Sequence, residues 1–187
     1  MTTSSLDQDL ASFLTGLEPA CTGRVSWRGG QIELEHDTFL TDRESPPSLT
    51  SSGRCIVLSG DRVLVMTNPT DTHILPGGRI EPGESIMAAT RREVREETGL
   101  ELANLRQIGV LVFRHLTPKP PAYRYPYPVF LNTIFVAEAM NPGDLLVNDT
   151  YEMSGEFVAH AGAEPRIAEY QRILLSEAVS RNADAAP

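Results

Sequence analysis

The sequence predicts an α/β protein of the α+β type, with a mixed β-sheet lying between helices. Apolar runs typical of strands recur along the chain, at residues 55–59, 62–66, 72–75, 108–113, 129–138 and 156–159. Two segments have helical character instead, residues 85–98 and residues 165–181. Strands, a helix, further strands and a closing helix, in this order, are typical of a sheet that is covered by helices.

The first two runs are predicted to be antiparallel, because Gly60-Asp61 between them favours a tight reversal. The segment 85–98 is rich in Ala, Glu, Arg and Met and lacks Gly and Pro, and Gly99 stands where a helix commonly ends in the left-handed conformation. The closing helix begins at Pro165 and repeats apolar residues on one face, at Ile167, Tyr170, Leu174 and Ala178.

Residues 1–48 are predicted to form an N-terminal extension that precedes a main domain at 53–182. Ser5 and Gln8 form a capping-box pattern ahead of an apolar helical stripe, and the runs 25–27 and 32–35 flank Arg28-Gly29-Gly30-Gln31 as in a hairpin. Thr41–Gly53, with two prolines and several serines, predicts a linker. The extension either packs on the core, forms a homodimer interface or covers the substrate.

The helix at 85–98 carries three glutamates on one face. Glu93 lies three residues before Glu96 and four before Glu97, so all three carboxylates can converge. Like charges at this spacing cost about 0.2–0.5 kcal/mol per pair, and the helix dipole disfavours anions in the last turn. A bound divalent cation would reverse both penalties, and carboxylates suit Mg²⁺ or Mn²⁺. The alternative is an ordinary solvated helix face.

The spacing around this helix matches a known signature at every position. Residues 78–100 read GRIEPGESIMAATRREVREETGL, which satisfies G-x5-E-x7-R-E-U-x-E-E-x-G-U with U a bulky aliphatic residue. This segment resembles the Nudix box of hydrolases that act on a nucleoside diphosphate linked to another group. The resemblance implies an α/β/α sandwich over about residues 53–182.

The resemblance also assigns roles to residues of the box. It implies a metal site formed by the Gly78 backbone carbonyl and by Glu93, Glu96 and Glu97. Arg92 is expected to pair with Glu84 or Glu96 and to hold their oxygens in place. Catalysis is accordingly expected to involve Glu97, Glu96 and Arg92. The general base is either Glu97 or, as in many relatives, a glutamate on a later loop, for which Glu152 and Glu156 are the candidates.

Substrate-binding residues are predicted around the double glycine of Leu75-Pro76-Gly77-Gly78, a turn at which backbone can approach a ligand. His73 is expected to line the pocket. Arg79 and Arg114 are candidates for binding phosphate, with Lys119 and Arg124 as further choices; each could equally be a solvated surface charge. Three tyrosines interleaved with prolines, Tyr123, Tyr125 and Tyr127, either stack on a base or sugar or pack within their own loop.

Composition limits the partners. The formal net charge is −9, with 25 acidic against 16 basic residues, which disfavours nucleic acid polymers and anionic membranes as ligands. Cys21 and Cys55 form no zinc or disulfide pattern, and the beginning of the chain has no signal-peptide character, so a cytoplasmic location is expected.

These observations together predict a Mg²⁺-dependent hydrolase that cleaves the pyrophosphate linkage of a small nucleotide through attack of water on phosphorus. The substrate is a nucleotide sugar, a dinucleotide or a nucleoside triphosphate, and the box does not distinguish among them. The alternatives are a non-catalytic nucleotide-sensing domain and an interaction domain in which the acidic helix is only solvated.

Overall fold

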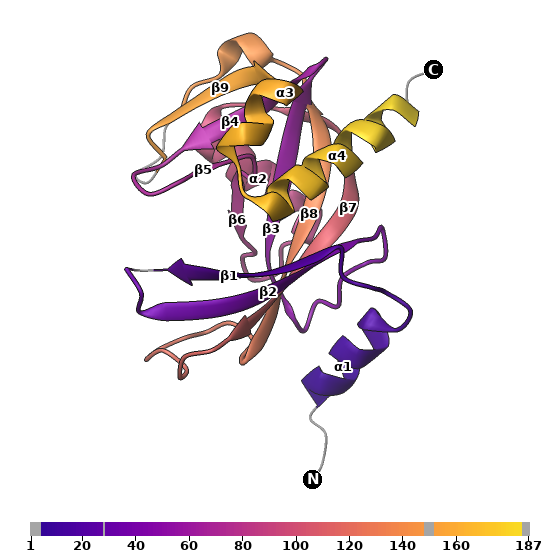
Figure 1. The fold of residues 1–187 in the computed structure, drawn as a ribbon, viewed down its shortest axis with the longest axis vertical. Coiled ribbons are helices and arrows are strands. Elements are labelled where there is room, and N and C mark those ends of the chain that lie inside the picture. Colours follow the sequence, from indigo (N-terminus) through magenta and orange to yellow (C-terminus); the bar gives the residue numbers. More distant parts are fainter. Residues whose placement is uncertain (1–4, 28, 148–151, 185–187) are drawn as a thin grey trace.

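The computed structural model describes residues 5–27, 29–147 and 152–184, which form one mixed sheet flanked by helices (Figure 1). The elements in chain order are α1 (Ser5–Leu14), β1 (Cys21–Trp27), β2 (Ile32–Leu40), β3 (Thr50–Ser59), β4 (Arg62–Thr67), β5 (Thr72–His73), β6 (Gly77–Arg79), α2 (Ile86–Thr98), β7 (Leu102–His115), β8 (Val129–Ala139), the 3₁₀ turn η1 (Pro142–Asp144), β9 (Ser154–Ala159), α3 (His160–Ala163), the 3₁₀ turn η2 (Glu164–Arg166) and α4 (Glu169–Asp184).

The sheet has nine strands in the order β1-β2-β7-β8-β3-β4-β5, while β6 pairs with β3 and β9 pairs with β4. Among the described strands, β3 and β8 run parallel and the other pairs are antiparallel. The sheet is therefore mixed and strongly curled, and the predicted α+β class is confirmed.

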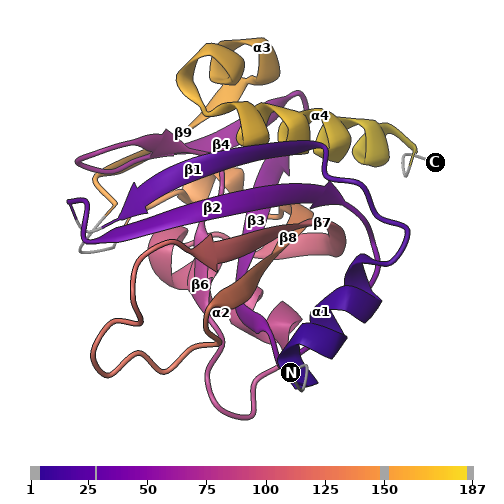
Figure 2. The same cartoon turned by 60° about the horizontal axis from the view of Figure 1, so that its bottom comes forward.

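Two helices cover opposite faces of the sheet. The side chains of α2 pack with a cluster around Val57, Leu64 and Phe135, whereas α4 packs through Leu174 and its neighbours over a larger cluster on the other face. Figures 1 and 2 show α4 and α2 separated by the strands. A third cluster around Phe13 and Leu131 lies under α1. The apolar runs of the sequence are thus buried on both faces of the central strands.

The N-terminal hairpin is part of the main sheet. β1 and β2 pair from Cys21↔Thr38 to Trp27↔Ile32, and β2 then pairs with β7 from Leu34↔His115 to Leu40↔Gly109. Its strands extend beyond the predicted apolar runs and include polar residues; β1 alternates half-buried and exposed positions, and β2 has buried and half-buried ones. Arg28 of the predicted turn and residues 1–4 lie outside the described residues.

The predicted linker at Thr41–Gly53 is wrong in its last four residues, because β3 already begins at Thr50. Ser51 and Ser52 are buried, and their hydroxyls lie 3.1 and 2.6 Å from Asn132 Oδ1 on β8. Side-chain hydrogen bonds therefore stabilise this part of the strand, and it has no apolar pattern to reveal it.

The double glycine lies in a strand and not in a turn, since Gly77–Arg79 forms β6 against β3. The short strand before it ends at His73 and does not reach Leu75. The closing helix also begins later than predicted: Pro165 belongs to η2, and α4 starts at Glu169. Pro165 therefore lies in a 3₁₀ turn that precedes the main helix.

Within the described residues, none of the helices is long and apolar enough to cross a membrane.

Candidate active site

Helix α2 has defined caps at both ends. The Ser85 hydroxyl accepts a hydrogen bond from the Ala88 N–H at 3.2 Å, and Gly99 closes the helix with φ 71° and an N–H bond of 2.8 Å to the Arg95 carbonyl. Ala89 and Val94 are fully buried against the sheet. The caps and this buried face fix the orientation of the opposite, glutamate-bearing face.

Arg92 is the organising side chain of that face. Its Nε and Nη2 donate two parallel hydrogen bonds to Glu84, at 3.0 and 2.9 Å. Its Nη1 lies 2.9 Å from Glu93 Oε1 and 3.1 Å from Glu96 Oε2, so these two carboxylates share one guanidinium. Its Nη2 also donates to the Arg79 carbonyl at 3.0 Å. The expected pairing with Glu84 or Glu96 thus occurs with both residues at once.

The same contacts shift the ionisation of the two partners. Hydrogen bonds from Arg92 hold the pKa of Glu84 below its ordinary value, and the hydrogen bond to Glu84 in turn raises the pKa of Arg92 further. Both groups are therefore charged at neutral pH, and the ion pair persists under the conditions in which the site would work.

The backbone of β6 approaches the glutamates closely. The Gly77 N–H donates to Glu97 Oε2 at 2.8 Å. Gly77 has φ 127°, and a Cβ there would lie 2.4 Å from the Gly53 carbonyl oxygen. A Cβ on Gly78 would lie 2.3 Å from Glu93 Oε2. Glycine is thus required at Gly77, where the clash is with backbone, and at Gly78 the carboxylate of Glu93 occupies the space that a side chain would take.

This donor set fits a hard divalent cation. Glu93 and Glu96 both accept hydrogen bonds from Arg92. Glu97 accepts the Gly77 N–H of β6, and the Gly78 backbone lies against the Glu93 carboxylate. Across the described ranges, no three acidic, His or Cys side chains form a ready-made cage for a metal. Mg²⁺ is commonly held by one or two carboxylates, with waters and substrate phosphates completing its shell. The residues present match that pattern.

Two of the other predicted residues flank the double glycine in the chain. Arg79 follows Gly78 on β6, and its backbone carbonyl accepts a hydrogen bond from Arg92. Its guanidinium lies over the Tyr125 ring, 3.8 Å from the ring centroid. His73 Nδ1 accepts the Leu75 N–H at 3.2 Å, which leaves Nε2 as the donor to Glu152 Oε1 at 2.9 Å. Glu152 is therefore anchored beside the segment that leads into the double glycine.

Two further candidates, Arg114 and Glu156, are placed differently. Arg114 is exposed on β7, opposite Glu35 of β2. Glu156 lies on β9, with its side chain 59% exposed and paired to Arg166 at 2.8 Å. The described contacts join neither residue to the glutamates of α2.

Comparison with known proteins identifies the family of this chain. The family model of the NUDIX domain matches residues 50–179, more than half of the chain. This chain belongs to the Nudix family. The predicted resemblance is thereby confirmed, and α2 is its Nudix helix.

Related Nudix proteins share parts of the sequence. The chain is 38% identical over 60 residues to the Nudix hydrolase YvcI of Bacillus subtilis, covering 32% of this chain and 38% of that protein. It is 42% identical over 69 residues to the NAD-capped RNA hydrolase NudC of Pseudomonas aeruginosa, covering 34% of this chain and 24% of that protein. The chain therefore matches well under half the length of these two curated relatives.

A solved structure supports the fold. The pyrophosphohydrolase BsRppH of Bacillus subtilis superposes with a TM-score of 0.53 at 16% identity, covering 87% of this chain and 98% of that one. At this level of identity the likeness concerns the fold alone.

Two residues missed by the sequence analysis support the segment from Ile74 to Gly77, which leads into β6. Arg54 on β3 donates to the carbonyls of Leu75 and Gly77, and Gln171 on α4 accepts the Ile74 N–H at 2.9 Å. Both reach this segment from elements distant in the chain. An isolated Arg in a strand and a Gln in a helix carry no sequence pattern that would have revealed this contact.

Proposed function

We propose that the protein hydrolyses the pyrophosphate linkage of a nucleoside diphosphate joined to another group, with Mg²⁺ or Mn²⁺ as cofactor. The observation that carries this proposal is the Arg92 network, which holds Glu84, Glu93 and Glu96 together against the backbone of β6. Membership of the Nudix family supports it.

Some residues of the site would bind the cation, and others would orient them or accept a proton. Glu93, Glu96 and the Gly78 carbonyl would hold the cation, and Glu97 would serve as a further ligand or as the base. When bound, the cation would neutralise phosphate charge and lower the pKa of an attacking water. Arg92 keeps the carboxylates oriented, a supporting role whose loss typically costs 10–100-fold in metal affinity or activity.

The reaction places the water oxygen on one phosphorus and breaks the bridging P–O bond. The proton of the water passes to a carboxylate, for which we propose Glu97. It is half-buried, it is oriented by the Gly77 N–H, and it lies at the same end of the helix as the metal-binding glutamates. Glu152, anchored by His73, is the second choice, and Glu156 the third.

The test is a substrate panel with and without Mg²⁺. Nucleotide sugars, dinucleotides and nucleoside triphosphates are incubated with the wild type, with Glu97→Gln and with Glu101→Gln, and the products are separated by chromatography. Glu101 is an exposed glutamate just beyond the same helix, paired with Arg95, and serves as the matched control. We expect a loss of at least about a hundredfold for Glu97→Gln and none for Glu101→Gln.

Two results would reject the proposal. One is the absence of turnover with every compound despite nucleotide binding, which would make the protein a sensing domain. The other is turnover that is unaffected by removal of divalent cations.

A further inference from the structure

Gln171 is a buried polar residue on the apolar face of α4. It is fully buried, and it shares this face with Leu174 and Ala178, which lie three and seven residues further along the helix. An amide buried among apolar side chains is unfavourable unless it forms hydrogen bonds. Here Oε1 accepts the Ile74 N–H at 2.9 Å, and Nε2 donates to the Tyr170 hydroxyl at 3.1 Å. The amide is therefore held in one orientation, with its oxygen toward Ile74.

The Ile74 N–H lies just past the end of a strand. β5 ends at His73, and the next strand, β6, begins at Gly77. Ile74 is itself fully buried, so its N–H requires a partner from another part of the fold. Gln171 supplies this partner to the connecting segment, residues 74–77, from a position 97 residues further along the chain.

Arg54 of β3 binds carbonyl oxygens of the connecting segment. Its Nη1 donates to the Leu75 carbonyl at 3.5 Å and also to the Gly77 carbonyl. The adjacent Cys55 N–H donates to the Pro76 carbonyl at 2.9 Å. Three consecutive carbonyls of the segment are thus fixed by β3, while its first N–H is fixed by α4.

The connecting segment carries the backbone that meets the glutamates of α2. The Gly77 N–H donates to Glu97 Oε2 at 2.8 Å. The next residue, Gly78, lies so close to Glu93 that a Cβ there would be 2.3 Å from Glu93 Oε2. A shift of the segment by about 1 Å would be enough to break the first contact and to change the second.

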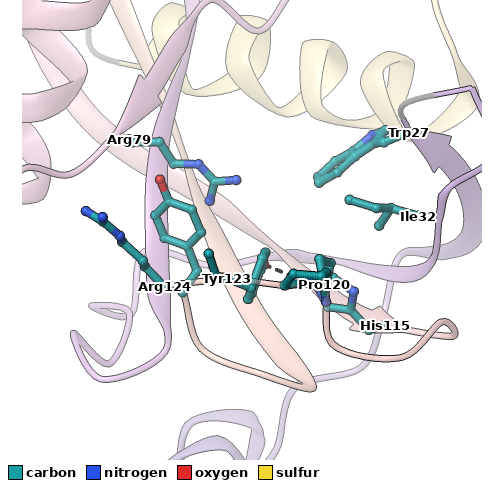
Figure 3. A pocket seen from close by; sticks show the side chains of 10 residues that line it. Trp27, Ile32, Arg79, His115, Pro120, Tyr123 and Arg124 are labelled. Carbon is teal, nitrogen blue, oxygen red and sulfur yellow. Dashed lines mark hydrogen bonds between the residues drawn. The ribbon is translucent and has the colours of Figure 1, made fainter.

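The same segment leads into Arg79, whose side chain lines a cavity of about 370 Å³ (Figure 3). The Arg79 carbonyl accepts a hydrogen bond from Arg92, and its guanidinium lies over the Tyr125 ring, which also lines the cavity. Trp27 and Ile32 lie across the cavity from Arg79 in Figure 3. The position of the connecting segment therefore also determines where Arg79 enters the cavity.

We propose that Gln171 and Arg54 are positioning residues of the metal site. By fixing the connecting segment, they hold the backbone of β6 against Glu93 and Glu97. This inference rests on the proposed function, and it adds helix α4, which lies outside the Nudix box, to the parts of the chain that form the site. If the two residues served only overall stability, their loss would act like any other destabilising change in the same elements.

The first measurement is the affinity for Mn²⁺ alone, recorded by electron paramagnetic resonance. Gln171→Met keeps an unbranched side chain but removes the acceptor of the Ile74 N–H. We expect it to weaken Mn²⁺ binding by at least about tenfold. The control is Ala178→Gly, which removes a buried methyl group and lowers helix propensity about two turns further along α4. This control should stay within about twofold of the wild type.

Hydrogen exchange gives a readout that needs neither metal nor substrate. The Gly77 amide, followed by nuclear magnetic resonance, reports on the hydrogen bond to Glu97, and the Val136 amide in the buried part of β8 reports on global unfolding. In Gln171→Met the ratio of the Gly77 exchange rate to the Val136 exchange rate is expected to rise by at least about tenfold. In Ala178→Gly this ratio should stay unchanged.

Arg54 is tested through a conservative replacement. Arg54→Met removes the donor to two carbonyls and should weaken Mn²⁺ binding by at least about tenfold. Arg54→Lys keeps a cationic donor and should bind Mn²⁺ with an intermediate affinity. Arg62→Met is the matched control, because Arg62 also donates to a backbone carbonyl, that of Phe157 on β9, and should leave the affinity within about twofold. Circular dichroism and urea denaturation check that each variant is folded.

The proposal is overturned if Gln171→Met and Arg54→Met bind Mn²⁺ like the wild type, if the Gly77 exchange ratio is unchanged in Gln171→Met, or if Ala178→Gly loses as much Mn²⁺ affinity. A wild type that binds Mn²⁺ and hydrolyses the panel, with variants that bind the ion equally well, would retain the proposed hydrolase and reject only the positioning role. A wild type that binds no Mn²⁺ would reject both.

Discussion

Arg92 and Glu84 form a bidentate ion pair, with Nε–Oε1 and Nη2–Oε2 distances of 3.0 and 2.9 Å, although Glu84 lies before the helix that carries Arg92. The remaining amino group of the guanidinium, Nη1, is thereby directed at Glu93 and Glu96. Only a planar, forked donor can make this set of contacts at once.

Arg92→Lys is therefore expected to impair the site although the charge is kept. A lysine ammonium cannot bind Glu84 through two parallel bonds and also reach Glu93, so the carboxylates lose their fixed positions. We expect a fall in kcat/KM of about 10–100-fold. Arg95→Lys, an exposed arginine of the same helix that pairs with Glu101, is the control and should stay within about twofold. Equal activity of the Arg92 variant and the wild type would remove Arg92 from its positioning role.

Gly78→Ala is expected to weaken metal binding. Its Cβ would lie 2.3 Å from Glu93 Oε2, so the carboxylate must move. We expect about a tenfold or greater loss of Mn²⁺ affinity, measured by electron paramagnetic resonance. Gly162→Ala is the control, because a Cβ there meets no atom within 4 Å. An unchanged Mn²⁺ affinity in the Gly78 variant would argue against Glu93 as a ligand.

Glu156→Gln is expected to retain activity within about twofold, because Glu156 is exposed and paired with Arg166 on β9. Steady-state kinetics with the best substrate of the panel compares it with Glu152→Gln and Glu97→Gln. A loss of at least about a hundredfold in the Glu156 variant alone would transfer the role of general base to that residue.

The unfolding free energy is expected to decrease as the pH falls below 6.5. Burial lowers the pKa of both His36 and His115 from 6.5, with Asp37 partly opposing this at His36. Between each lowered pKa and 6.5 the unfolded chain binds more protons than the folded one, so acid favours unfolding there. Within this pH range each histidine adds up to about 1.4 kcal/mol per pH unit to the slope of the unfolding free energy against pH. Above pH 6.5 neither histidine adds to that slope.

Urea denaturation of the wild type and of His115→Phe at pH 5.5 and 7.5 measures how much His115 contributes to this pH dependence of the unfolding free energy. The wild type should lose more stability between the two values than the variant does. A larger loss in the variant would contradict the assigned direction.

The sequence determined the Nudix helix, its glutamates and the pairing of Arg92, because these depend on spacing within one short helical segment and its flanking turns. The period of the helix alone places Glu93, Glu96 and Glu97 together, and Gly99 ends the helix wherever it packs. Tertiary structure decided the rest. Arg54 supports the glycine segment because β3 pairs with β6, and Trp27 and Tyr125 line one cavity because the hairpin pairs with β7. Such neighbours are set by strand register over long separations, which no local pattern of residues encodes.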